Sequence, residues 1–218
     1  MTAVRIVAID GAAGSGKSTL ARGLARALRL PYLNTGLMYR ALTLEARARG
    51  VDPQDGPALA ALMQTLVFAL DAGDPPELSI GGSPPGPELE GSDVEAHVSR
   101  VAGHPQVRGL MRDAQRHLGR DGAVMEGRDI GSVVFPEAPV KIYLVADADV
   151  RARRRARERA DDNAVGRALL DRDQRDMKVN VFEAPEGGVV IDTTGLDVEG
   201  TVEAALRLIR ERAPELLP

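Results

Sequence analysis

Residues 4–28 read VRIVAIDGAAGSGKSTLARGLARAL, and this stretch decides the fold of the chain. Its first six residues are almost continuously apolar, which is typical of a β-strand that is buried on both faces. A glycine-rich turn follows, and then Leu20, Leu24 and Leu28 recur at the four-residue spacing of one helix face. The stretch therefore predicts a buried strand, a tight loop and a helix in direct succession.

The loop itself matches a phosphate-binding motif. Gly11–Ser18 reads GAAGSGKS, which fits G-x-x-x-x-G-K-S/T at a strand-to-helix junction. Glycines let backbone N–H groups turn inward around a phosphate, and the helix N-terminus adds its positive end. Lys17 would reach the β and γ oxygens, and the Ser18 hydroxyl would bind Mg²⁺. The motif predicts a nucleoside triphosphate as phosphoryl donor, bound by Gly11, Ala12, Ala13, Gly14, Ser15, Gly16, Lys17, Ser18 and Thr19.

Strand-like and helix-like segments alternate along the rest of the chain. The pattern predicts five buried strands and a helix after most of them, which is the signature of a parallel sheet covered on both faces. We therefore expect an α/β fold of the P-loop NTPase type, with a parallel five-stranded sheet. The further strands are expected at 30–33, 123–125, 140–145 and 189–191, and the further helices at 36–49, 149–159, 163–175 and 198–212.

One region interrupts this alternation. Residues 71–91 are rich in Gly and Pro, and two helices are predicted after them. The first opens at Ser92 with Glu95 three residues later, a capping box, and the second starts at Pro105. On the second helix, Arg112 and Arg116 are expected on a solvated face. The chain is thus divided into a core of residues 1–64 and 119–218 and a small inserted lobe of residues 65–118.

An arginine-rich segment lies between the fourth strand and the C-terminus. Residues 151–159 read RARRRARER. Taken alone, such a run is more often a solvated helix. Phosphoryl transfer, however, needs positive charge around the migrating group. Beside a phosphate loop the run predicts a helical lid over about residues 151–175, whose arginines are Arg151, Arg154, Arg155 and Arg159.

The stretch MEGRDIG, residues 125–131, puts an Arg and an Asp directly after a buried strand. Ligands of open parallel sheets lie beyond the carboxyl ends of the strands. Arg128 can hold phosphate oxygens, and Asp129 can accept a hydrogen bond from an exocyclic amine. Cytosine carries such an amine at N4, whereas uracil presents an acceptor there. The pair therefore predicts a catalytic site with Lys17, Arg128 and Asp129 and favours a cytosine acceptor.

Several stretches resemble the bacterial cytidylate kinases: IDGAAGSGKST, PYLNTGLMYRAL, SRVAGHPQVR, EGRDIGSVVFPEAPVKIYLVA and RDQRD. The resemblance implies ATP-dependent phosphorylation of CMP and dCMP, with Mg²⁺, on a core with an acceptor-binding insert and a lid. It implies that Ser99, Arg108 and Asp129 read cytosine, that Arg40 and Arg128 bind the acceptor phosphate, and that Arg172 and Asp176 bind the sugar. Thr35, where the family has Ser, and Tyr39 complete the implied CMP site.

The sequence departs from the family pattern at one position, and it does not identify the second acidic contact to Mg²⁺. Many relatives carry an Arg at the position of Val179, and Lys178 beside it could substitute as a point charge. For the second acidic contact to Mg²⁺, Asp129 and a water-mediated arrangement both stay open.

Composition limits the other classes of function. A net charge of −4 does not favour a nucleic-acid binder. The absence of Cys excludes thiolate chemistry, and no apolar run approaches the roughly 18 residues of a membrane span. We expect a cytoplasmic monomer whose partners are small-molecule nucleotides, without nucleic acid or membrane. Rival functions are a UMP/CMP kinase, a shikimate-type kinase and a nucleotide-binding switch; the GTPase form of the last lacks an N-K-x-D motif.

Overall fold

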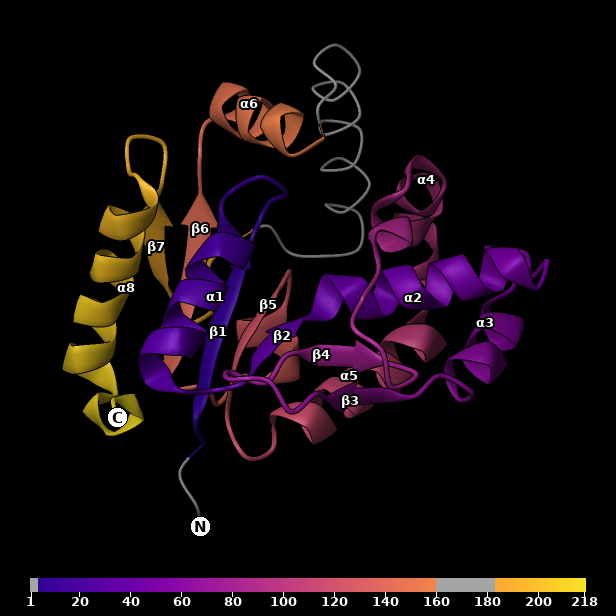
Figure 1. Ribbon diagram of the computed structural model, residues 1–218, viewed down its shortest axis with the longest axis horizontal. Helices are drawn as coiled ribbons and strands as arrows, with labels where there is room; N and C mark the ends of the chain where they lie inside the picture. Colours follow the sequence, from indigo (N-terminus) through magenta and orange to yellow (C-terminus); the bar gives the residue numbers. More distant parts are fainter. Residues whose placement is uncertain (1–3, 160–182) are drawn as a thin grey trace.

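The computed structural model describes residues 4–159 and 183–218 of the chain (Figure 1). Within these ranges no helix combines the length and the apolar character that crossing a bilayer requires. Several predicted features lie outside the described residues: the helix expected at 163–175, the lid beyond residue 159, and Arg172, Asp176, Lys178 and Val179.

The centre of the molecule is a five-stranded parallel sheet, as predicted. Its order is β2-β5-β1-β6-β7, so β1 lies in the middle and pairs with β5 and β6. The predicted third strand was too short, because β5 continues through Glu126 to Gly127. The strands are β1 (Ile6–Gly11), β2 (Tyr32–Asn34), β5 (Ala123–Gly127), β6 (Val140–Val145) and β7 (Val189–Asp192).

Helices cover both faces of the sheet, which confirms the predicted layers. Side chains alternate along β1, so Val7 and Ile9 pack toward α1 and α8, whereas Ile6 and Ala8 pack toward α2, α3 and α5 (Pro105–Gly119). Figure 1 shows α8 and α1 at one side of the molecule and α2 extending toward the other. The helices are α1 (Lys17–Leu28), α2 (Thr35–Ala48), α3 (Gly56–Met63), α6 (Ala148–Arg159) and α8 (Val198–Arg212), with a short turn η3 (Pro214–Leu216) at the C-terminus.

Residues 65–118, the inserted region of the sequence prediction, pack beside the sheet, and one feature here differs from what the sequence predicted. Helix α4 starts at Ser92 as expected, but Gly91 is its N-cap and no capping box forms. The Glu95 carboxylate instead pairs with the Arg40 guanidinium at 2.5 Å, so it ties α4 to α2. The elements here are β3 (Phe68–Leu70) antiparallel to β4 (Leu78–Ile80), η1 (Pro87–Glu90), α4 (Ser92–Val101) and α5 (Pro105–Gly119).

Arg116 is exposed, as predicted, but its guanidinium also binds the protein. Its Nε donates to the carbonyl oxygen of Val134 at 2.6 Å, and its Nη2 donates to that of Val133 at 3.1 Å. Both carbonyls belong to η2 (Ile130–Val134), a single π-helical turn that follows β5. Arg116 therefore ties α5 to the segment that directly follows Arg128 and Asp129.

Candidate active site

The phosphate loop joins the central strand to α1 in a conformation that requires glycine. Gly14 and Gly16 have φ angles of 74° and 94°, in the left-handed region. A Cβ at Gly14 would also lie 2.9 Å from the carbonyl oxygen of Arg151 on α6. The Lys17 ammonium donates to the carbonyl oxygen of Ala12 at 2.8 Å, so it lies across the loop. The loop thus leaves an open cradle of backbone groups with a cation at its edge.

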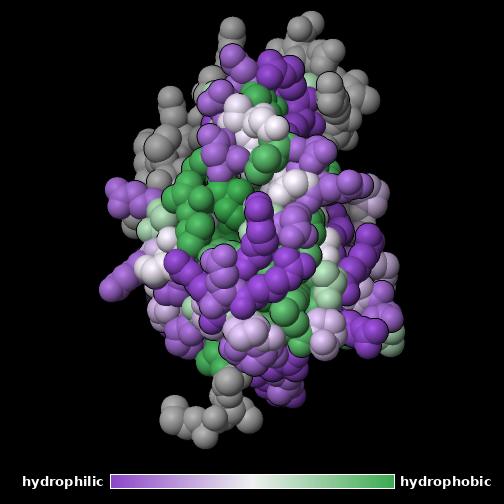
Figure 2. Space-filling model, turned by 90° about the vertical axis from the view of Figure 1, so that its left-hand side faces the viewer, coloured by the Kyte–Doolittle hydropathy of each residue, from purple (hydrophilic) through white to green (hydrophobic). Residues whose placement is uncertain are grey.

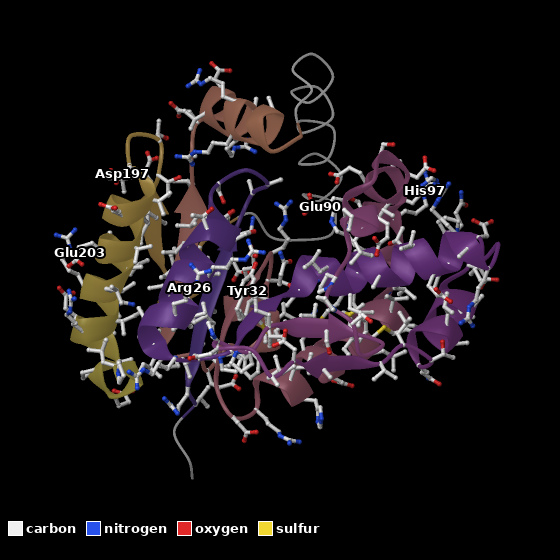
Figure 3. The ribbon with its side chains drawn as sticks, viewed as in Figure 1. Arg26, Tyr32, Glu90, His97, Asp197 and Glu203 are labelled. Carbon is white, nitrogen blue, oxygen red and sulfur yellow. The ribbon has the colours of Figure 1, made fainter. Side chains whose placement is uncertain are left out.

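A pocket opens at the carboxyl ends of β2 and β5 beside this loop. In Figure 3 the labelled Glu90, one of its lining residues, lies on the side of the inserted region that faces the loop. The lining comes from the loop, α2, η1, α4, α5 and the segment after β5. It brings together most residues assigned from the sequence: Lys17, Ser18, Thr35, Tyr39, Arg40, Ser99, Arg108, Arg128 and Asp129.

Asp129 and Arg108 form an ion pair within the pocket. The Arg108 guanidinium donates to the Asp129 carboxylate, and both side chains are about four-fifths shielded from solvent. Burial raises the pKa of Asp129, while the charge and the hydrogen bond of Arg108 act to lower it. The pair joins α5 of the inserted region to the segment after β5, and its hydrogen-bonding groups adjoin the pocket.

The two arginines expected at the acceptor phosphate are held by backbone and carboxylate oxygens. Arg40 is 5% exposed and donates to the carbonyl oxygen of Leu89 at 2.9 Å as well as to Glu95. Arg128 donates to the carbonyl oxygen of Gly11 at 3.2 Å. Both guanidinium groups are therefore oriented before a ligand arrives, which lowers the entropic cost of binding an anion.

Glu126 is the functional candidate that the sequence analysis missed. The Ser18 hydroxyl donates to its Oε2 at 3.0 Å, and the Tyr32 hydroxyl donates to its Oε1. The Glu126 side chain is buried, and the Arg22 guanidinium lies 5.0 Å from the centre of the Tyr32 ring. Burial and the neighbouring Glu126 carboxylate raise the pKa of Tyr32, so its hydroxyl stays a donor. The carboxylate next to Ser18 is thus that of Glu126, whereas Asp129 pairs with Arg108.

Thr35 contacts the backbone of Glu126. Its hydroxyl donates to the backbone carbonyl oxygen of Glu126 at 2.7 Å. The side chain of Asn34 caps α2 by accepting from the N–H of Leu37 at 3.3 Å. The hydroxyl proton of Thr35 is therefore committed to the backbone, and only its oxygen lone pairs are available to a ligand.

The first arginines of α6 contact the loop region rather than bulk solvent. Arg151 donates to the carbonyl oxygen of Ala13 at 3.2 Å. Arg154 donates to the hydroxyl and carbonyl oxygens of Thr193 at 2.9 and 2.7 Å. The side chains of Arg155 and Arg159, the other two predicted lid arginines, lie outside the described part of the structure.

A second hollow lies on the other side of the phosphate loop, under Arg154. It is lined by the loop, the start of α1, and the segment that leads into α8. Two of its apolar side chains, Leu196 and Val198, are exposed by 39% and 56%. Figure 2 shows an apolar area among polar side chains on the face of the molecule that carries α8. The hollow thus offers both an apolar wall and a guanidinium beside the loop.

Asp10 is the other buried carboxylate of the region. It is 2% exposed, and its Oδ1 and Oδ2 accept from the backbone N–H groups of Ile130 and Gly131, both at 2.8 Å. Burial raises its pKa to about 6, although the two N–H groups and Lys17 act to lower it. No role for Asp10 was predicted from the sequence.

We expect the raised pKa of Asp10 to appear in the pH dependence of folding. Because this pKa is about 6 in the folded state against an ordinary value of 3.8, the folded protein binds the proton first as the pH falls. Protonation between pH 7 and pH 5 therefore adds about 1 kcal/mol to the free energy of unfolding. Urea unfolding at both pH values, compared with Asp10→Asn, isolates this contribution. Equal changes in the two proteins would contradict it.

Comparisons with known proteins agree with the family resemblance seen in the sequence. A family model described as cytidylate kinase matches residues 7–211. The cytidylate kinase of Mycobacterium avium (strain 104) is 41% identical over 224 residues, which cover 98% of each chain. The cytidylate kinase of Roseiflexus castenholzii (strain DSM 13941 / HLO8) is 41% identical over 226 residues, covering 99% of this chain and 97% of its own.

A solved structure shares the fold at a much lower sequence identity. The crystal structure of a gluconokinase from Sinorhizobium meliloti 1021 is 15% identical and has a TM-score of 0.51, covering 98% of this chain and 95% of that chain. At this identity the likeness shows the α/β kinase fold alone.

Proposed function

Because the chain belongs to the cytidylate kinase family, we propose that it transfers the γ-phosphoryl group of ATP to CMP and dCMP, giving CDP and dCDP. One observation supports this assignment most: the Asp129–Arg108 pair adjoins a pocket that also contains Arg40, Arg128 and the phosphate loop. The reaction needs a group that recognises the cytosine ring, here a carboxylate. It also needs cations that bind the phosphate groups of donor and acceptor.

The donor lies across the phosphate loop. Backbone N–H groups of the loop and Lys17 hold its β- and γ-phosphates, as in other loops of this sequence pattern. Its adenine occupies the second hollow, where Leu196 and Val198 offer apolar contact and Arg154 offers a guanidinium face. The hollow and the pocket adjoin the same loop, so the γ-phosphate points toward the acceptor.

The acceptor lies between the inserted lobe of residues 65–118 and the core. Its phosphate binds Arg40 and Arg128, and its cytosine N4 amine donates to Asp129. Ser99 and Arg108 adjoin the other base edges, and Thr35 and Tyr39 line the same pocket. The sugar contacts carried over from the family, Arg172 and Asp176, lie outside the described residues.

Mg²⁺ fits the oxygen groups beside the loop. A hard cation prefers hydroxyl, carboxylate and water oxygens, and the Ser18 hydroxyl lies 3.0 Å from the Glu126 carboxylate. Ser18 and Glu126 would hold the ion, directly or through water, while Tyr32 orients the carboxylate. Bound there, Mg²⁺ would neutralise negative charge on the β- and γ-phosphates.

The acceptor phosphate needs no strong general base, since it is already an anion at neutral pH. What the transfer needs is alignment and positive charge around the migrating phosphoryl group. Lys17 of the phosphate loop and Arg128 of the segment after β5 supply that charge. The first lid arginines, Arg151 and Arg154, adjoin the loop and exclude water from it.

The test is an acceptor panel with purified protein and Mg·ATP: CMP, dCMP, UMP, AMP and shikimate. We expect CMP and dCMP to be phosphorylated with a kcat/KM at least about 100-fold above that of UMP, because uracil O4 would face the Asp129 carboxylate with two acceptors opposed. AMP and shikimate serve as controls for the adenylate and small-metabolite alternatives. A UMP value equal to that of CMP would replace this proposal with a UMP/CMP kinase.

A further inference from the structure

The Asp10 carboxylate contacts the acceptor-binding segment without lining the pocket. The segment Gly127–Gly131 carries Arg128 and Asp129, which adjoin the acceptor, and it ends in the two N–H groups that Asp10 binds. These N–H groups open the π-helical turn η2, where a helix has no partner of its own for its first donors. Asp10 therefore supplies partners from the central strand, about 120 positions away in the sequence.

The segment lines the pocket on one side, and its two end glycines are closely packed on the other sides. A Cβ at Gly127 would lie 2.6 Å from the Thr35 hydroxyl oxygen, and one at Gly131 would lie 3.0 Å from Pro185 Cγ. The carbonyl oxygen of Asp129 accepts from the N–H groups of Val133 and Val134 at 2.9 and 3.2 Å. The packed glycines limit movement away from the pocket, so the hydrogen bonds of the segment decide how Arg128 and Asp129 face the pocket.

The geometry of the Asp10 contact fixes orientation as well as position. Two oxygens of one carboxylate hold two consecutive N–H groups, so rotation of this part of the backbone would break at least one bond. Arg128 adds a third tie from the same segment, because its guanidinium donates to the carbonyl oxygen of Gly11, the residue after Asp10. The end of β1 thus holds the acceptor segment at three points.

We propose that Asp10 is a positioning residue that orients Arg128 and Asp129 toward the acceptor nucleotide, an inference that rests on the proposed function of the pocket. Asp10 does not contact the substrate. It acts through the backbone, and it links the strand that leads into the phosphate loop to the segment that reads the acceptor. The donor and acceptor sites are thereby held in a fixed position relative to each other.

The test is Asp10→Asn. The amide keeps one acceptor oxygen but turns an NH₂ group against the second backbone N–H, so the segment shifts. We expect the KM for CMP to rise by about tenfold or more and the CMP-to-UMP ratio of kcat/KM to fall by a similar factor, since small misplacements of positioned groups are costly. The KM for ATP should change by less than about threefold. Equal changes in both KM values, or none, would overturn the proposal.

These readouts do not depend on how much of a variant sample is folded, because KM and a ratio of kcat/KM values are independent of the active concentration. Asp10→Ser, which is smaller and keeps one acceptor, provides a second variant and should show the same selective effect. The matched control is Asp55→Asn. Asp55 also accepts from a backbone N–H at a helix start, that of Ala58 at 2.9 Å, but it does not line the pocket. Its kinetics should equal those of the wild type.

A double-mutant cycle tests the route of action. If Asp10 acts through Asp129, the effect of Asp10→Asn on the CMP-to-UMP ratio should disappear in an Asp129→Asn background. A full effect in that background would contradict the inference. Failure of the proposed function can be distinguished from failure of this inference. If the wild-type protein prefers another acceptor, the KM values for that acceptor and for ATP are compared instead, and this comparison still tests Asp10.

Discussion

Replacement of Lys17 by Ala lowers kcat by about 10³-fold or more, with the fold retained. Removal of one cation from a phosphoryl-transfer site has costs of this size, because the transition state spreads negative charge over the transferred group. In the structure the Lys17 ammonium lies over the loop, bonded to the Ala12 carbonyl oxygen at 2.8 Å, within reach of phosphates bound there. Steady-state kinetics with Mg·ATP and CMP, alongside thermal unfolding, measures the effect.

A second substitution at the same position separates charge from shape. Lys17→Arg keeps the positive charge, but its planar fork cannot occupy the place of a compact ammonium in the loop, so we expect most of the activity to be lost. Arg210→Ala is the control for loss of a cation, since Arg210 lies on α8 in an exposed pair with Glu203 at 2.9 Å. Robust turnover by Lys17→Ala would contradict the role of the loop as the donor site.

The sheet and its flanking helices could be predicted because their patterns are local. Four apolar positions of β1 alternate between two cores, and the leucines of α1 repeat every four residues, so burial alone dictates each element. The glycines of the phosphate loop are equally local signals, since Gly14 and Gly16 occupy left-handed backbone. Such features can be recognised without knowing which distant residues contact them in the folded protein.

The residues that the sequence analysis missed depend on distant partners. Glu126 looked like a loop residue after an apolar run, and only the register of β5 between β1 and β2 shows that its carboxylate meets Ser18 and Tyr32. Glu95 fits a capping box locally, but an ion pair with the buried Arg40 outweighs a surface cap. Asp10 likewise gains its role from N–H groups of a turn more than a hundred residues later.

Asp129→Ala reduces kcat/KM for CMP by about 30-fold or more, equivalent to about 2 kcal/mol of transition-state stabilisation. The cause is loss of a charge-assisted hydrogen bond to the N4 amine in a pocket where the carboxylate is largely shielded from water. The effect should fall on CMP and dCMP and much less on UMP, because uracil has no amine for Asp129 to accept from. The measurement is kcat/KM for the three acceptors at saturating Mg·ATP.

Asp129→Asn tests recognition of the nucleotide base specifically, because it preserves the volume of the side chain. Its amide can donate to uracil O4 as well as accept from cytosine N4, so the preference for CMP over UMP should shrink by about tenfold or more. The matched control is Asp93→Asn, an exposed carboxylate of α4 paired with Arg47 at 2.8 Å. An unchanged CMP-to-UMP ratio in Asp129→Asn would remove Asp129 from the base-reading role. Because Arg108 pairs with that carboxylate, the same result would mean that the ion pair serves only to connect α5 to the segment after β5.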